Sequence, residues 1–124
     1  MIDPAVMQNI AETYLKCVTA QDVEGVCALY ADEAIVEDPI GTEAYVGIDA
    51  IRGFYETALK NNKFVCELSG PVRCAASSLA FPFLLTVPRV RTNNIIDVFD
   101  LNENGKVIAM KAYWGPANIT PFAD

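Results

Sequence analysis

The chain of 124 residues contains no histidine. Without an imidazole, Ser-His-Asp and Cys-His nucleophile systems and the common zinc hydrolase sites are excluded. The G-x-G-x-x-G and phosphate-loop motifs of nucleotide-binding proteins are also missing, and so is the G-x-S-x-G motif of hydrolases. If the protein is an enzyme, its acid–base chemistry has to come from carboxylates, tyrosine, lysine or cysteine. We predict no metal ion and no cofactor.

Basic residues are scarce and scattered, with nine Lys and Arg against sixteen Asp and Glu. The net charge of −7 argues against nucleic acid as a partner, because binding to a phosphate backbone requires a basic stripe. No apolar run approaches the roughly 20 residues of a membrane span, and the N-terminus lacks a signal-peptide pattern. The four cysteines show no C-x-x-C spacing, which favours free thiols over disulfides and a cytoplasmic protein.

The length and hydropathy of the chain indicate the number of domains and the tendency to self-associate. One domain over residues 1–124 is expected, because domains typically contain about 100–150 residues. Hydrophobic residues make up 52% of the chain and the mean hydropathy is +0.24. A domain this small and apolar is expected to leave part of its apolar surface exposed, and an exposed apolar sheet face favours a homodimer.

The pattern of apolar residues predicts helices first and strands afterwards. Asp3-Pro4 starts a helix that runs to about Thr19, and Asp22 caps a shorter one that carries Tyr30. A third helix follows Gly47. Alternation then predicts strands over residues 34–37, 64–68, 78–87, 91–101 and 106–114.

Three helices followed by a mostly antiparallel sheet constitute an α+β plan. Long twisted strands that curl around helices form a cone, and an apolar interior of this shape suits a flat hydrophobic ligand. Pro82 lies inside one of the long strands, which predicts a bulge or an unpaired edge at that point.

Asp97 is the most unusual polar residue of the predicted sheet. It shares one face of its strand with Ile95 and Phe99, while Asp100 falls on the other face. A carboxyl on an apolar face favours the protonated form and would donate a hydrogen bond near neutral pH. The alternative is that Asp97 faces outward at the sheet surface.

Tyr14, Tyr30 and Tyr55 fall on the apolar sides of the three predicted helices. They would form either one hydrogen-bonded chain of phenols or three separate core residues bonded to backbone carbonyls. Asp38 precedes Pro39 and is therefore expected at a strand end, as a turn former or as a general base at the mouth of a cavity. Trp114 and Met110 are in phase on the last strand and fit either core or pocket lining.

The sequence resembles bacterial ketosteroid isomerase, a family of the NTF2-like superfamily, over nearly its whole length. The specific motifs are the tyrosine of the first helix, Val36-Glu37-Asp38-Pro39 and Ile96-Asp97-Val98-Phe99. The phrase Tyr30-Ala31-Asp32-Glu33-Ala34 is widespread in NTF2-like proteins and is weaker evidence. The resemblance implies an NTF2-like cone in which three N-terminal helices pack in a curved, mostly antiparallel sheet.

The resemblance also implies an activity, the conversion of 3-oxo-Δ5 steroids into 3-oxo-Δ4 steroids through a dienolate. Asp38 matches the general base, Tyr14 and Asp97 match the oxyanion donors, and Tyr30 and Tyr55 match the supporting phenols. The implied substrate is a small hydrophobic steroid. The residues expected to line its pocket are Phe54, Phe81, Phe83, Met110 and Trp114.

Two departures from the family pattern leave the substrate range and the assembly open. The connection over residues 88–94 looks shorter and more basic than in the best-known members, and Pro82 interrupts a strand. The alternatives are another NTF2-like enzyme, of the polyketide cyclase type, or a non-catalytic carrier of hydrophobic ligands. Dehydratases of the superfamily use histidine, which this chain lacks. Its epoxide hydrolases pair Asp with Arg, and we expect no arginine of this chain to point inward. Two buried carboxyls count against a carrier.

Overall fold

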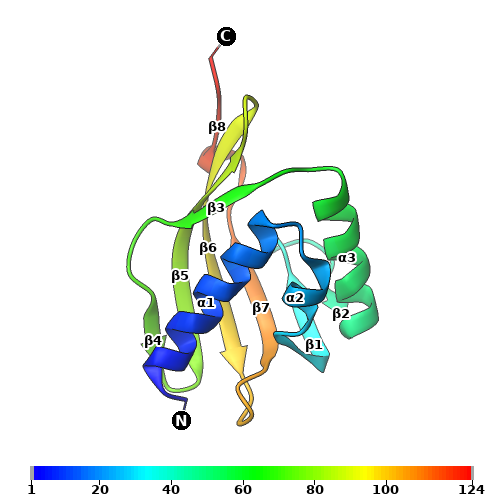
Figure 1. Cartoon of the computed structure of the whole chain (residues 1–124), viewed down its shortest axis with the longest axis vertical. Coiled ribbons are helices and arrows are strands. Elements are labelled where there is room, and N and C mark those ends of the chain that lie inside the picture. Colours follow the sequence, from blue (N-terminus) through cyan, green and yellow to red (C-terminus); the bar gives the residue numbers. More distant parts are fainter. Residues whose placement is uncertain (1, 124) are drawn as a thin grey trace.

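The computed structural model describes residues 2–123 and has the predicted α+β architecture (Figure 1). Its helices are α1 (Pro4–Thr19), α2 (Val23–Cys27) and α3 (Ile48–Lys60), with a 3-10 turn over Pro116–Asn118. The strands are β1 (Tyr30–Glu37), β2 (Tyr45–Val46), β3 (Val65–Leu68), β4 (Arg73–Ala75), β5 (Ser78–Val87), β6 (Arg91–Leu101), β7 (Val107–Tyr113) and β8 (Ile119–Pro121).

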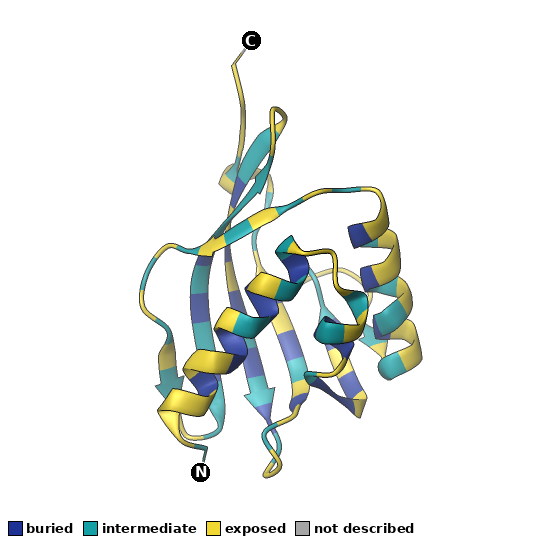
Figure 2. Ribbon diagram, in the orientation of Figure 1, coloured by how far each residue is buried: buried dark blue, intermediate teal, exposed yellow. Residues whose placement is uncertain are grey.

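Aspartate caps define the N-terminal ends of α1 and α2, as predicted. The Asp3 carboxylate accepts a hydrogen bond from the amide of Ala5 at 2.7 Å, and Asp22 accepts one from Gly25 at 2.9 Å. Both bonds satisfy amides that have no partner within the helix. The buried side of α1 then follows the helical period: Met7, Ile10, Ala11, Tyr14, Leu15 and Val18. Figure 2 shows this buried side turned toward the sheet.

The strands form one curved sheet in the order β2-β1-β7-β6-β5-β3, and β4 and β8 add to β5 and β6. The β1–β7 pair is parallel and the other pairs are antiparallel. Helix α1 packs against β3, while α3 packs against β1 and β2. The sheet therefore wraps around the helices and encloses an apolar interior, and the β5–β6 hairpin and β8 extend beyond them (Figure 1). The predicted arrangement of three helices packed in a curved, mostly antiparallel sheet is confirmed.

The second helix is shorter than the sequence predicted. Tyr30 begins β1 instead of continuing α2, because it pairs with Val107 and hydrogen bonds hold the preceding residues at the start of β7. The Leu29 carbonyl accepts from the amide of Val107 at 2.9 Å, and the Ala28 carbonyl accepts from Lys106 Nζ at 2.7 Å. Tyr30 still points inward and is 5% exposed.

Of the two alternatives predicted for Pro82, the bulge is wrong, and the unpaired edge is found, because neither β3 nor β4 pairs with this residue. The β5–β6 register runs unbroken through Pro82, which pairs with Ile96. On the opposite side of β5, the Pro82 carbonyl accepts from the amide of Ser69 at 3.1 Å, in the gap between β3 and β4. The nitrogen of a strand residue points to the same side as its carbonyl. The missing N–H of Pro82 therefore lies where no neighbouring strand requires a donor.

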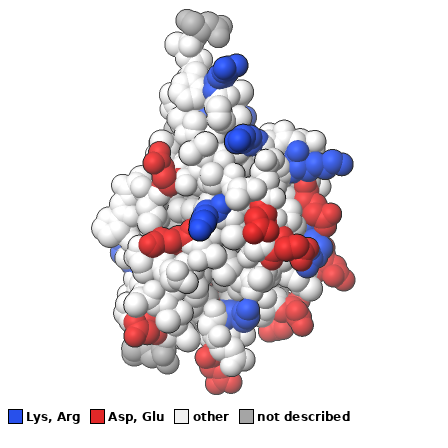
Figure 3. Space-filling model, viewed as in Figure 1, with Lys and Arg blue, Asp and Glu red and all other residues white. Residues whose placement is uncertain are grey.

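The surface carries charges of both signs. On the face drawn in Figure 3, Lys and Arg lie among Asp and Glu without forming a continuous stripe. Within residues 2–123, no helix has the length and apolar character needed to cross a bilayer.

Candidate active site

Strand β6 carries Asp97 into the interior. Alternate residues of the strand are buried, from Asn93 through Ile95, Asp97 and Phe99 to Leu101. Asp97 pairs with Phe81 on β5 and with Ala112 on β7, and it is 2% exposed. The carboxyl that could have faced either side of the sheet thus lies on its apolar inner face.

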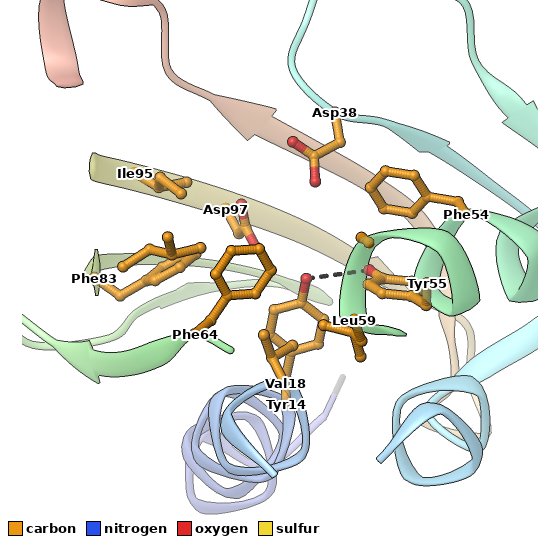
Figure 4. A pocket seen from close by; sticks show the side chains of 12 residues that line it. Tyr14, Val18, Asp38, Phe54, Tyr55, Leu59, Phe64, Phe83, Ile95 and Asp97 are labelled. Carbon is orange, nitrogen blue, oxygen red and sulfur yellow. Dashed lines mark hydrogen bonds between the residues drawn. The ribbon is translucent and has the colours of Figure 1, made fainter. Parts of the chain in front are cut away.

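The three buried tyrosines form one hydrogen-bonded chain. The Tyr55 hydroxyl on α3 lies 2.7 Å from that of Tyr30 on β1 and 3.1 Å from that of Tyr14 on α1. Figure 4 shows the Tyr14 hydroxyl at the cavity with Tyr55 beside it. Two phenols thereby support the one whose oxygen reaches the cavity, which strengthens it as a donor.

The ring of Tyr14 is fixed by aromatic neighbours. Phe99 and Phe81 meet it edge to face, with ring centroids 5.1 and 6.1 Å away. Phe81 and Met110 were expected to line the pocket, but both are buried in the core and neither is among the residues that line the cavity. Their side chains fall on the same inner face as Asp97, but the helices cover that part of the sheet.

Asp38 stands immediately after β1, as the following proline predicted, and its peptide bond to Pro39 is cis. The Trp114 indole, just beyond the end of the neighbouring strand β7, donates to Asp38 Oδ1 at 2.9 Å. The amide of Ile40 donates to the Ala112 carbonyl at 2.9 Å, which ties the turn to the same strand. The indole therefore fixes the carboxylate at the side of the cavity, and the backbone bond fixes the turn that carries it.

The cavity has an inner and an outer part. The inner part, of about 70 Å³, is lined by Tyr14, Asp38, Asp97 and apolar side chains that include Phe54, Phe64 and Phe83. Figure 4 shows the Asp38 and Asp97 carboxyls and the Tyr14 hydroxyl around this space. The outer part, of about 210 Å³, shares six lining residues with it: Asp38, Phe54, Ala58, Phe64, Leu85 and Ile95. The two parts therefore form one continuous cavity.

The outer part contains polar residues that the sequence analysis missed. Arg91 and Asn93 line it together with Trp114 and Ile119. The expectation that no arginine points inward is thus corrected, since Arg91 contributes to the cavity wall. Both residues are in phase with Asp97 on β6, so the alternation that selected Asp97 would also have selected them.

The two carboxyls differ in their electrostatic environment. Burial raises the pKa of Asp97 well above its usual value, and the nearby charge of Asp38 adds to the effect. Burial also raises the pKa of Asp38, but the hydrogen bond from Trp114 favours the ionised form and lowers it. As pH rises, Asp38 therefore ionises first while Asp97 keeps its proton.

The phenol of Tyr14 is held in its neutral, donating form. Burial raises its pKa well above the usual value, and the charge of Asp38 adds to the effect, while the hydrogen bond with Tyr55 opposes it. The inner cavity thus combines one ionisable base with two neutral donors. Among residues 2–123, no cluster of three or more Cys, Asp and Glu could hold a metal ion.

A curved sheet wrapped around three helices, with a cavity whose polar groups lie among apolar walls, defines the chain as an NTF2-like protein. The SnoaL-like domain family matches residues 11–110. The chain therefore belongs to this family.

Named relatives in the family are enzymes of two kinds. The chain is 34% identical over 113 residues to the Steroid Delta-isomerase of Nocardioides simplex, covering 87% of this chain and 90% of the relative. It is 31% identical over 119 residues to Epoxide hydrolase LasB of Streptomyces lasalocidi, covering 89% of this chain but 42% of that protein. These similarities confirm the resemblance found in the sequence and support an enzymatic role.

A solved structure has the same fold. The epoxide hydrolase/cyclase-like enzyme SalBIII, studied for its role in pyran ring formation in the polyether salinomycin, superposes with a TM-score of 0.89. The alignment covers 98% of this chain and 100% of that one, at 24% sequence identity. This likeness concerns the fold alone.

The burial of Asp97 predicts a pH-dependent cost to stability. An unfolded Asp ionises with a pKa of about 3.9, whereas the folded pKa is raised. Stability is therefore lost as pH rises from the unfolded to the folded pKa, by about 1.4 kcal/mol per pH unit. We expect Asp97→Asn to raise the free energy of urea unfolding at neutral pH more than at about pH 3. Asp100→Asn, on the other face of β6, is the matched control, and an equal effect of Asp97→Asn at both pH values would contradict the prediction.

Proposed function

We propose that the protein is a cofactor-independent steroid Δ5-isomerase that converts 3-oxo-Δ5 steroids into 3-oxo-Δ4 steroids. The observation that carries the proposal is the arrangement of the inner cavity. One carboxyl is poised to ionise, and a second carboxyl and a supported phenol stay neutral in the same apolar space. Such a set suits proton abstraction next to a carbonyl, followed by stabilisation of the resulting oxyanion.

In the proposed first step, the substrate ketone enters the inner cavity, and its oxygen accepts hydrogen bonds from Tyr14 and Asp97. The Asp38 carboxylate removes a proton from the carbon between the ketone and the double bond. The electron pair of that C–H bond moves toward the carbonyl and produces a dienolate. Its negative charge develops on oxygen, where donors fixed in a water-poor cavity are most effective.

In the second step, the protonated Asp38 returns the proton two carbons further along. The double bond is then conjugated with the restored ketone, and Asp38 is a carboxylate again. The rings of Phe54, Phe64 and Phe83 form apolar walls against which a flat polycycle can lie. A single base serves both carbons because Asp38 borders both parts of the cavity and lies alongside the bound rings. The indole of Trp114 steadies the base during both transfers.

Removal of the base tests the reaction. We expect purified protein mixed with 5-androstene-3,17-dione to generate the ultraviolet absorbance of the conjugated enone. Asp38→Asn should reduce turnover by ~10²–10⁴-fold, the range of general acid–base contributions, while equilibrium dialysis shows the steroid still bound. Glu37→Gln, which makes the same change at the adjacent residue, should keep normal turnover. Near-normal turnover in Asp38→Asn would show that Asp38 is not the base. Steroid binding without turnover in the wild type would indicate a carrier.

The oxyanion donors are tested separately. Tyr14→Phe removes one donor, which in other enzymes costs ~10²–10³-fold in turnover, and Asp97→Ala should cost somewhat less. Tyr30→Phe makes the same chemical change at the far end of the phenol chain and should have a smaller effect, because Tyr55 still supports Tyr14. Full turnover in Tyr14→Phe, or equal losses in the two tyrosine variants, would contradict the assigned role.

A second candidate is an epoxide hydrolase or a cyclase that acts on a polyketide. The observation that favours it is Arg91 in the same cavity wall as Asp38, together with the similarity to Epoxide hydrolase LasB. The arrangement of donors favours the isomerase. Tyr14 and Asp97 lie in the inner part, whereas Arg91 lines the outer part. A polar substrate group is therefore expected to bind between Tyr14 and Asp97 in the inner part.

We further propose that the protein is a homodimer joined through the outer face of its sheet. Ile96 and Tyr113 are neighbours across β6 and β7 on this face and are 45% and 50% exposed. Ile108 on β7 and Ile35 on β1 are also exposed. Exposed apolar side chains gathered on one face of a sheet favour association.

The dimer is tested by introducing a charge. Ile96→Glu would bury an unpaired carboxylate in the interface, so we expect a monomer in sedimentation analysis at micromolar concentration. Val6→Glu, at an exposed position on helix α1 on the other side of the sheet, should leave the dimer intact. A dimeric Ile96→Glu variant, or a monomeric wild type, would contradict the proposed interface.

We also propose a cytoplasmic location. Cys17, Cys27, Cys66 and Cys74 are free thiols, and free thiols are typical of proteins in a reducing compartment.

A further inference from the structure

The inner face of β6 continues past the proposed active site toward the outer cavity. Asp97, Ile95, Asn93 and Arg91 follow one another at steps of two residues on this face. With a rise of about 3.4 Å per residue, Asn93 lies roughly 14 Å and Arg91 roughly 20 Å along the strand from Asp97. A polycycle whose ketone reaches Asp97 therefore presents its opposite end to this pair.

Asn93 carries an acceptor that the protein does not satisfy. The side chain is 6% exposed, and its Oδ1 atom is buried and receives no hydrogen bond within the described residues. Its strand neighbours are Leu85 on β5 and Ile119 on β8, which offer no side-chain donor. A buried acceptor without a donor is costly, and most such groups in proteins have a partner. A donor supplied by a ligand would remove this cost.

Arg91 supplies hydrogen-bond donors beside the unsatisfied acceptor. Its side chain lines the outer cavity together with Asn93. The single ion pair found among residues 2–123 joins Arg52 to Glu24, so no carboxylate of this part of the chain neutralises Arg91. The outer cavity thus offers an acceptor and a cationic donor to a bound ligand.

We infer that the outer cavity recognises a hydroxyl group at the end of the substrate opposite its ketone. This inference rests on the proposed isomerase function and names its substrate class, a hydroxylated 3-oxo-Δ5 steroid. A hydroxyl donates its proton to Asn93 Oδ1, and its oxygen accepts from Arg91. A ketone or a carboxylate at the same position satisfies Arg91 but leaves the Asn93 acceptor unpaired.

Binding measurements separate this subsite from the reaction. The probes are three 3-oxo-Δ4 steroids that differ only at the far end: 17β-hydroxyandrost-4-en-3-one, androst-4-ene-3,17-dione and androst-4-en-3-one. Trp114 is the sole tryptophan and lines the outer cavity, so its fluorescence reports occupancy. We expect the hydroxy steroid to bind about 10-fold tighter than the diketone, as one added hydrogen bond to a buried acceptor allows.

Two variants distinguish the two partners. Asn93→Ala should abolish the preference for hydroxyl over ketone, whereas Asn94→Ala, the same change on the outer face of the strand, should preserve it. Arg91→Met should weaken the hydroxy and keto steroids alike and leave androst-4-en-3-one unchanged. Arg89→Met removes an equal charge from the adjacent hairpin turn and should change none of the three.

The outcomes separate the subsite from the isomerase. Equal affinities for the three steroids in the wild type, or a preference that survives Asn93→Ala, would overturn the hydroxyl subsite even if 5-androstene-3,17-dione is isomerised. The expected preferences without isomerisation would support the subsite and refute the proposed reaction. If none of the three steroids binds, both are wrong.

Discussion

Burial of the Asp97 carboxyl is the constraint on which the site depends. A central strand carries it on its apolar inner face, between Phe81 and Ala112 on the neighbouring strands, at 2% exposure. Ionisation there is unfavourable, so the group stays protonated and costs the fold stability at neutral pH. The same protonation turns a residue that usually accepts hydrogen bonds into a donor. The burial that keeps Asp97 protonated therefore lowers the stability of the fold and also makes the residue a suitable donor in the proposed oxyanion site.

Topology separates the two carboxyls chemically. Asp97 lies in the middle of β6, whereas Asp38 follows the last residue of β1, where the chain leaves the sheet. The parallel β1–β7 pairing brings Trp114, just beyond β7, within 2.9 Å of Asp38, and its indole donor favours the ionised carboxylate. One strand interior and one strand end thus supply an acid and a base from the same amino acid. No basic side chain beside either carboxyl is required for the difference.

The sequence predicts those features that depend on neighbouring residues. Capping by Asp3 and alternation in β5 and β6 were sufficient to place these elements, and the proline after Asp38 located that residue at a strand end. Tyr30 was assigned to the wrong element because its strand pairing depends on Val107, far away in the chain. Alternation could not decide which face of β6 points inward, since Asp97 and Asp100 give opposite answers. That choice, like the phenol chain across α1, α3 and β1, is determined by packing between distant segments.

The fold does not determine the reaction, because relatives named as an isomerase and as an epoxide hydrolase share this family. The depth at which each polar group lies is more informative. Tyr14 and Asp97 line the small inner part, so in the proposed reaction the substrate atom that gains negative charge enters first and lies deepest. Asp38 borders both parts and can therefore reach carbons along the side of an inserted ring. Opening an epoxide at Arg91 would leave both inner donors without a role, whereas isomerisation of an inserted ketone uses all three groups.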